Sequence, residues 1–160
     1  MSLVKVDFAE LYRRHLCRHS QFGINVLHLL AVAGIYLAMF GIAFSVPGSA
    51  WIVGVALTGY TLLLLPNVPP RLLLVNLVGV LLLLALFLAL PRAPWWVYVG
   101  LIVVWHRFQV WNHRIYDKSH DMSRFEQKYR KGPALSLLLA IYELPILLNY
   151  LVFDRRNWTS

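Results

Sequence analysis

The hydrophobic positions of this chain fall into long runs that polar turns separate. Residues 24–46 and 72–90 are almost continuously apolar, and other apolar runs cover residues 51–65, 95–105 and 134–153. A helix needs about 20 apolar residues to cross a hydrocarbon core roughly 30 Å thick, so these runs predict membrane-spanning helices. Proline-containing turns separate the first four runs. The pattern predicts an all-α protein, a polytopic transmembrane helical bundle of four to five spans.

Amphipathic and polar segments flank the apolar runs. Residues 6–19 alternate apolar side chains with arginines at helical spacing, which predicts an N-terminal amphipathic helix. Residues 20–23, which follow, predict a bend. The fourth span continues as a polar extension to near Tyr116, and the polar residues 117–132 predict a short surface helix that begins at Ser123.

Composition and charge place this bundle in a membrane and orient it. The chain has 160 residues, 59% of them hydrophobic and 14% charged, and we expect one domain of residues 1–160. The net charge of +8 would indicate a nucleic-acid partner in a soluble protein. Here the basic residues flank apolar spans, where they follow the positive-inside rule and contact anionic headgroups. We therefore expect membrane lipids and no nucleic acid as partners; the oligomeric state stays open.

The basic residues also give an orientation. One basic cluster precedes the first span and another follows the fourth, so four crossings separate the two clusters. Both clusters therefore fall on the same side, which the positive-inside rule makes cytoplasmic. The sequence predicts an integral protein of a bacterial inner membrane or the endoplasmic reticulum, with its N-terminus in the cytoplasm.

The six histidines carry the most specific chemistry in the sequence. The predicted topology places them all near the cytoplasmic boundary, although they come from opposite ends of the chain. Imidazole nitrogen is the commonest protein ligand for iron and zinc. On an unbroken helix His19 and His28 would point in opposite directions, so their convergence requires a bend around Gly23. We predict a metal site at the cytoplasmic face from five of the histidines: His15, His19, His28, His106 and His113.

Helical phase supports this grouping. His15 and His19 are four residues apart and share a helix face. His106 and His113 are seven apart and also share a face, and Gln109 lies on the same stripe. For any single histidine, the alternative is an interfacial residue without a bound metal.

Two further residues of the sequence bear on this site. His120 lies beside Asp121 in a polar stretch and is expected to face solvent. Glu143 is the only carboxylate deep in an apolar span, where an ionisable side chain is a functional candidate by default. Together with Gln109, it is expected to support the metal ligands.

Two blocks of the sequence resemble a known family. They are residues 19–28 (His-Ser-Gln-Phe-Gly-Ile-Asn-Val-Leu-His) and residues 109–113 (Gln-Val-Trp-Asn-His), followed by Asp117 and by the run Lys-Gly-Pro-Ala-Leu at residues 131–135. These blocks are similar to those of small integral membrane proteins of bacteria and fungi. That family includes the iron(II)-dependent 2-hydroxy-fatty-acid dioxygenase of fatty-acid α-oxidation.

The resemblance implies a non-haem iron(II) site, dioxygen and a lipid substrate, namely a 2-hydroxy fatty acid that loses one carbon. Neutral imidazoles leave iron(II) with open positions for oxygen and for a bidentate hydroxy-carboxylate. The carboxylate would approach from the basic cytoplasmic rim, and the acyl tail would lie among leucine-rich helices. The candidates for binding the carboxylate are Arg14, Arg18, Arg107 and Arg114.

Other classes of protein stay open at this point. Histidines from the first and fourth spans are also able to ligate a b-type haem for electron transfer. A non-catalytic membrane scaffold or a transporter would need no stoichiometric metal. The membrane di-iron hydroxylases and desaturases fit less well, because they carry boxes with adjacent histidines and this chain has no His-His pair.

Overall fold

The computed structural model of the chain describes residues 5–116, 123–126 and 132–158. Within these residues the regular structure is helical and no β-strand occurs, which confirms the predicted all-α class. The α-helices are α1 (Phe8–Leu16), α2 (Phe22–Ala43), α3 (Ser49–Leu64), α4 (Pro70–Ala89), α5 (Trp95–Ile115), α6 (Ser123–Glu126) and α7 (Pro133–Leu148), and two turns of other helical type, η1 (Asn149–Phe153) and η2 (Arg155–Asn157), follow α7.

Local sequence signals explain where several helices begin. The Asp7 side chain accepts a hydrogen bond of 3.0 Å from the backbone N–H of Glu10 and so caps α1. Pro70 and Pro133 stand in the first turns of α4 and α7, where the missing N–H removes no intrahelical bond. The expected bend lies between Leu16 and Phe22, and the glycine that was expected to form it is inside α2.

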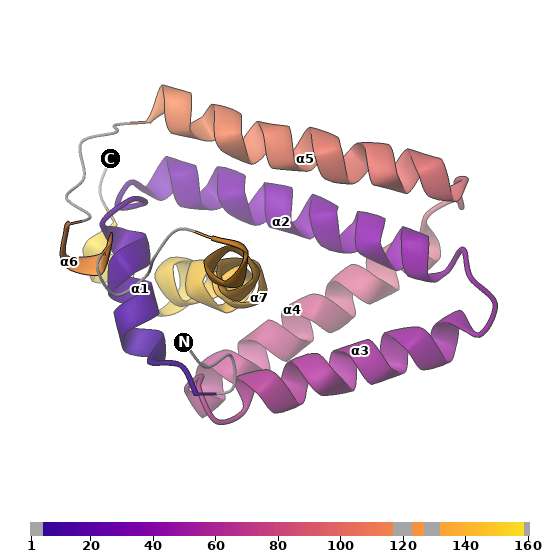
Figure 1. Ribbon diagram of the computed structural model, residues 1–160, viewed down its shortest axis with the longest axis horizontal. Coiled ribbons are helices and arrows are strands. Elements are labelled where there is room, and N and C mark those ends of the chain that lie inside the picture. The colour runs from indigo at the N-terminus through magenta and orange to yellow at the C-terminus, as the bar shows by residue number, and fades with distance from the viewer. Residues whose placement is uncertain (1–4, 117–122, 127–131, 159–160) are drawn as a thin grey trace.

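Helices α2 and α5 form the closest pair in the structure and lie side by side (Figure 1). Glycines of α2 make this approach possible. A Cβ atom at Gly34 would collide with the ring of Trp105, and one at Gly41 would collide with the ring of Tyr98. Small residues let helix backbones approach in membranes, where packing drives association. The pairing brings the start of α2 beside the end of α5.

Helix α7 closes the bundle at the end where α1 lies. One apolar cluster joins α7 to α1, to the α3–α4 turn and to the start of α4, and it includes the fully buried Leu11, Leu64 and Leu138. A second cluster joins α7 to the middles of α2 and α4 through Val32, Val80 and Leu147. The two clusters fix α7 from both sides.

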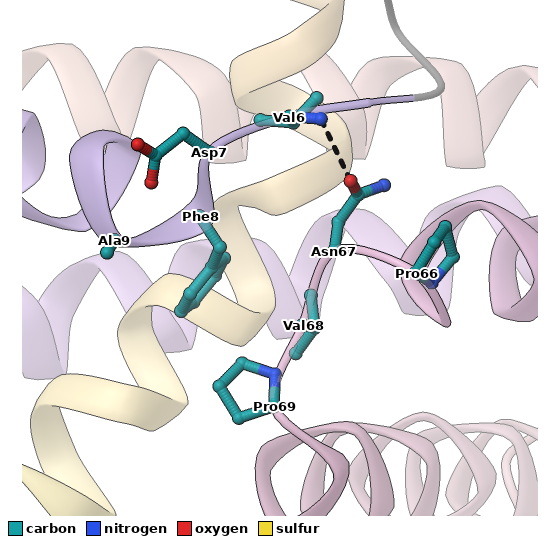
Figure 2. A pocket seen from close by; sticks show the side chains of 8 residues that line it. All are labelled: Val6, Asp7, Phe8, Ala9, Pro66, Asn67, Val68 and Pro69. Atoms are coloured by element: carbon teal, nitrogen blue, oxygen red, sulfur yellow. Dashed lines mark hydrogen bonds between the residues drawn. The ribbon is translucent and has the colours of Figure 1, made fainter.

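The α3–α4 turn contacts the N-terminal segment (Figure 2) and is also hydrogen-bonded to α7. The backbone N–H of Val6 donates to Oδ1 of Asn67 at 2.8 Å, and Nδ2 of Asn67 donates to the Tyr142 hydroxyl at 2.9 Å. An open pocket beside this contact is bordered by residues 6–9 and 66–69. The only charged side chain in its lining is Asp7, which caps α1.

Three helices of the described chain are long and apolar enough to cross a membrane: α2, α4, and α7 together with η1. Helix α3 is apolar but shorter, at 16 residues. Helix α5 has 21 residues, but its second half carries the polar side chains expected of it. The chain therefore has the character of a membrane protein, and the number of spans stays a prediction.

The direction of α7 was not predicted. In Figure 1, α2, α3 and α5 run across the picture, whereas α7 is seen almost end-on. Helix α7 therefore crosses the α2–α5 pair steeply instead of continuing the up-and-down pattern. The middle of α7 and the η1 turn after it both lie near the histidine-bearing end of the bundle, because Gln109 donates to Glu143 of α7 and the Tyr150 hydroxyl of η1 donates to the carbonyl of Ser20.

Candidate metal centre

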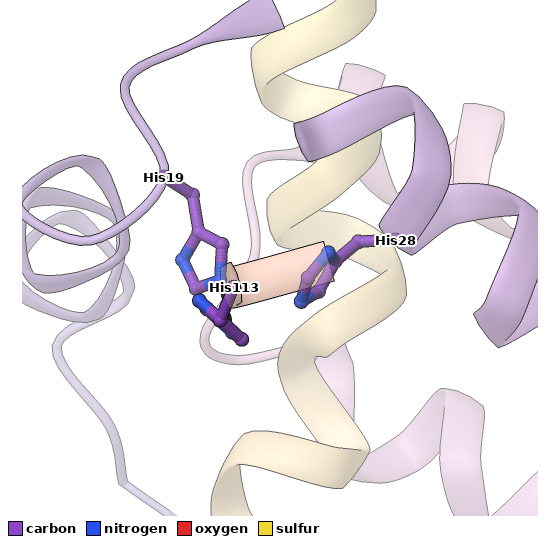
Figure 3. Close-up of side chains that lie close together, drawn as sticks. All are labelled: His19, His28 and His113. Atoms are coloured by element: carbon purple, nitrogen blue, oxygen red, sulfur yellow. Dashed lines mark hydrogen bonds between the residues drawn. The ribbon is translucent and has the colours of Figure 1, made fainter. Parts of the chain in front are cut away.

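Three histidines from three parts of the chain meet at one end of the α2–α5 pair (Figure 3). His19 comes from the linker between α1 and α2, His28 from the second turn of α2, and His113 from the end of α5. One nitrogen of each ring lies within 4.8 Å of the other two. His19 and His28 are buried, and His113 is half-buried. Three imidazoles at this separation could hold a metal ion.

The hydrogen bonds at His28 fix which of its nitrogens is available. Its Nδ1 lies 3.0 Å from the carbonyl oxygen of Ile24. A carbonyl can only accept, so Nδ1 carries the proton and Nε2 keeps a lone pair, as in most metal-binding histidines. This bond also fixes the orientation of the ring.

His19 and His113 face each other through their Nε2 atoms, 3.3 Å apart. In a hydrogen bond between them, one Nε2 carries a proton and donates it to the lone pair of the other. If both rings carry their proton on Nδ1 instead, both Nε2 lone pairs point into the same space, where a metal ion could accept them. With metal–nitrogen bonds of about 2.1 Å, two donors on the same side of an ion lie about 3.0–3.4 Å apart. The Nε2 atoms of His19 and His113 already have this separation, and a pair as far apart as 4.8 Å would have to approach by about 1.5 Å for the three donors to bind one ion.

Asn25 holds the linker that carries His19. This side chain is fully buried, and its Nδ2 donates to the carbonyls of His19 at 2.6 Å and Gln21 at 2.9 Å. With both amide protons used, Oδ1 accepts a bond of 2.7 Å from Nε2 of His15. The His15 ring in turn stacks on that of His19, with 4.3 Å between centroids. His15 therefore lies beside the three-histidine group and supports it.

Burial keeps the histidines outside the spans neutral. Burial lowers the pKa of His15 from 6.5 to about 4, against the hydrogen bond to Asn25, which raises it. Burial also lowers the pKa of His19 well below its ordinary value, and the neighbouring histidines add to the effect. Neutral imidazole is the form that binds metal, so no proton has to leave these rings first at neutral pH.

The three histidines open onto a cavity of about 210 Å³. Its polar walls include Gln109 and Glu143, and Nε2 of Gln109 donates to Oε1 of Glu143 at 2.8 Å. The apolar walls are Val110, Leu139 and Ile146. The site thus combines nitrogen donors, a carboxyl group and an apolar wall in one space.

The four candidate arginines divide into two pairs. Arg14 and Arg18 line the cavity, and Arg14 is buried there. Arg107 and Arg114 are exposed on α5, outside the lining of the cavity. The first pair is placed to meet an anionic group inside the site, and the second pair lies outside the cavity on the surface of α5.

The other predicted site residues lie as follows. His106 lines the cavity but is exposed and stands apart from the three-histidine group. Seven residues along a helix correspond to a rise of about 10.5 Å, which is too far for His106 and His113 to share one ion. His120, Asp117 and the start of the Lys-Gly-Pro-Ala-Leu run lie outside the described residues.

Sequence reasoning did not assign Asn25 its role. The residue appeared only as part of a motif, although an amide within an apolar span is itself a signal of an inward-facing polar contact. Asn112 shows that an amide buried in an apolar helix does not always have a hydrogen-bond partner. It is fully buried between α2 and α5, and neither atom of its amide has a hydrogen-bond partner among the described residues.

No family model, no curated protein and no solved structure matches this chain. The resemblance to the dioxygenase family therefore stays a prediction.

Proposed function

We propose that this protein is a membrane-embedded non-haem iron(II) oxygenase that shortens a 2-hydroxy fatty acid by one carbon. The observation that carries the proposal is the convergence of His19, His28 and His113 at a cavity that also contains arginines and an apolar wall. The resemblance of residues 19–28 and 109–113 to the α-oxidation family supplies the reaction class.

The donor set is compatible with iron(II). Three neutral nitrogens occupy one side of an ion and leave positions open for substrate and dioxygen. When bound, iron(II) would supply Lewis-acid polarisation of the hydroxy-carboxylate and redox chemistry with dioxygen. The chain positions these donors through the carbonyl of Ile24, which orients His28, and through Asn25, which holds the loop of His19.

The cavity supports an anionic lipid as substrate. Arg14 and Arg18 would pair with its carboxylate, because a guanidinium matches a carboxylate in charge and shape. Glu143, held by Gln109, is the group beside the ligands that is able to take up or release a proton. Arg107 and Arg114 would attract the headgroup before it reaches the cavity.

The proposed reaction balances without a further reductant. The C1–C2 bond breaks, C1 leaves as carbon dioxide, and C2 is oxidised to the new carboxyl group. Four electrons pass from the acid to one dioxygen molecule, which supplies the added oxygen atom and is otherwise released as water. This agrees with the absence of a glycine-rich dinucleotide motif from the sequence.

The arrangement of the rings favours an ion over haem. A bis-histidine haem needs two axial rings with a flat macrocycle between them. Here the ring of His28 lies 4.7 Å from that of His19 and 5.0 Å from that of His113, and all three point into the same space. A Soret band in the purified protein would establish the haem alternative. A scaffold or transporter predicts no stoichiometric metal.

Metal retention and turnover test the proposal together. Iron-loaded protein in detergent is incubated with 2-hydroxypalmitate under air and under nitrogen, and oxygen uptake and the shortened acid are measured. We expect both only under air, with no added nicotinamide or flavin. A metal-replete protein that forms no shortened acid across several chain lengths would overturn the proposed reaction.

Variants connect this activity to the site. His28→Ala and His113→Ala should abolish metal retention while the protein still inserts, and His120→Ala, expected to be peripheral, is the control. Full metal occupancy in both site variants would remove the metal assignment. Arg18→Gln should raise KM more than it lowers kcat, since the interaction with the carboxylate is present before the reaction begins.

The proposed orientation places the site on the cytoplasmic side. In a Cys17→Ser background, single cysteines at the exposed Ser20 and Ser123 should react with a membrane-impermeant reagent from the same side. A cysteine at the exposed Pro91 should react from the opposite side. Opposite accessibility of Ser20 and Ser123 would refute the topology.

A further inference from the structure

The cavity beside the histidines is closed at one end and open at the other. The end formed by His19, His28 and Ile146 is buried. The other end is bordered by His106 and Val110 of α5, both exposed, the latter to 44%. The opening therefore lies along α5.

This opening lies between α5 and α7. Helix α5 packs along α2, and its backbone approaches that of α7 only loosely within the described residues. The two helices share the cavity wall, with Val110 on one side and Leu139 on the other, and the hydrogen bond from Gln109 to Glu143 spans them at this level. The seam is bridged by side chains and is not sealed by close backbone packing.

The surface of α5 beside the opening carries exposed apolar side chains. Val110 is 44% exposed, and Val103, which lies seven residues earlier and therefore on the same face of α5, is 57% exposed. Half-exposed apolar side chains suit contact with acyl chains and not with water. The cavity thus opens toward the hydrocarbon region beside α5 and α7.

The cavity lining also carries positive charge. Arg14 and Arg18 line the cavity from α1 and from the residue after its C-terminal cap. The Nε of Arg18 is buried and has no hydrogen-bond partner among the described residues, so a ligand that accepts hydrogen bonds would satisfy it. An occupant with an anionic head and an apolar tail matches this combination of lining residues.

The size of the cavity decides how much of such a molecule it contains. Sites that enclose a whole ligand measure about 300–1,000 Å³, and this cavity measures about 210 Å³. A long-chain acid therefore cannot lie wholly inside. Its head and first carbons fit, and the rest of the chain must pass out through the seam.

We propose that the seam bordered by Val110 and Leu139 is a lateral portal through which a single-chain anionic lipid reaches the site from the bilayer. The head lies toward Arg14 and Arg18, and the tail stays in the membrane. The proposal deepens the function proposed above by naming the access route, and it rests on that function only for the identity of the lipid.

Photo-crosslinking tests the portal without turnover. Benzoylphenylalanine is placed at position 110 or 139, and at position 104 as a control, because Val104 is 60% exposed on another face of α5. Each protein is reconstituted in phosphatidylcholine vesicles with alkyne-tagged palmitate and illuminated. At saturating lipid, a tenfold excess of untagged 2-hydroxypalmitate should reduce labelling at 110 and 139 by about tenfold if the two acids bind with equal affinity. Labelling at 104, which reports bulk lipid, should change little.

Several outcomes would overturn the proposal. If untagged 2-hydroxypalmitate left labelling at 110 and 139 as unchanged as labelling at 104, no portal would exist at these positions. If hexadecanol reduced labelling as strongly as 2-hydroxypalmitate does, the portal would not select an anionic head. The same conclusion would follow if 2-hydroxypalmitate competed undiminished in a protein carrying both Arg14→Gln and Arg18→Gln. Oxygen consumption without competed labelling would refute the portal alone, whereas competed labelling without oxygen consumption would refute the oxygenase alone.

A narrowing variant gives a second, independent measurement. Val110→Trp should weaken the competition by 2-hydroxypalmitate at position 139 while the protein retains its metal, and Val104→Trp should leave the competition unchanged. Metal retention in Val110→Trp excludes misfolding as the cause. Undiminished competition in this variant would count against a passage at Val110.

Discussion

Asn25 offers the sharpest test of how the fold positions the metal ligands. Its amide donates to the carbonyls of His19 and Gln21 and accepts from His15, and the side chain has no exposed surface. We consider two substitutions. Asn25→Ala removes all three hydrogen bonds, whereas Asn25→Asp keeps an acceptor for His15 and loses both donors.

The structure sets the size of the effect. A buried polar group left without its partner costs about 1–3 kcal/mol. The carbonyl of Gln21 is the more accessible of the two acceptors, because its residue is half-buried and water is able to replace the amide there. We therefore expect Asn25→Ala to lower the free energy of unfolding by about 2–4 kcal/mol. In a chain of this size that lowers Tm by roughly 5–15 °C.

Metal affinity should fall in parallel. Loss of a residue that orients a ligand weakens metal binding by about 10- to 100-fold. Asn25→Asp should be no better than Asn25→Ala, because its carboxylate would face two carbonyl oxygens now 2.6 and 2.9 Å from the amide nitrogen. The assay is anaerobic titration of the metal-free protein with iron(II), or with cobalt(II) as an optical probe, alongside thermal unfolding without metal.

The control is Asn157→Ala, which removes an exposed amide that bonds Asp154. This variant should match the unaltered protein in both measurements. If Asn25→Asp bound metal with unaltered affinity, the bonds to the linker carbonyls would be irrelevant to the site. If Asn25→Ala also did so, the linker would hold His19 without Asn25, and the reasoning would be refuted.

Two further predictions concern helix packing and pH. Gly34→Val should destabilise the protein by about 1–3 kcal/mol and weaken metal binding, because the valine side chain would meet the Trp105 ring and separate α2 from α5. Gly54→Val is the matched control, because the space around Gly54 is open. Equal Tm values for the two variants would contradict the packing argument. The pKa values of His15 and His19 are lowered on folding, so the unfolded chain binds more protons and stability falls as pH drops below 6.5, for His15 down to about 4. Tm of the metal-free protein should therefore be level above neutral pH and fall through this window, and a Tm that rises on acidification would show that the histidines are not buried neutral.

The sequence alone determined the helical class and most helix boundaries. Apolar runs and the prolines between them located α2 to α5 within about three residues, since an apolar segment in a membrane must satisfy its own backbone as a helix. The same reasoning found the histidines, because ionisable side chains at the edge of an apolar span are costly and therefore informative.

Only the tertiary structure decided which histidines meet. Helical phase placed His106 and His113 on the same face of α5. Phase does not give the position along the helix axis, and the two histidines are about two turns apart along it. The place of His19 depends on an irregular linker held by Asn25, and no periodicity predicts such a path.

The direction of α7 was likewise beyond the sequence. Residues 134–153 predicted an apolar helix of spanning length, and the helix is present. A helix that is apolar on nearly every side has no single face to indicate its neighbours. Its steep crossing of α2 follows from contacts on both flanks, with α1 and the α3–α4 turn on one side and the middle of α4 on the other. That crossing brings Glu143 to Gln109 and gives the cavity its second wall, because residues 34 positions apart in sequence meet only when the whole bundle has packed.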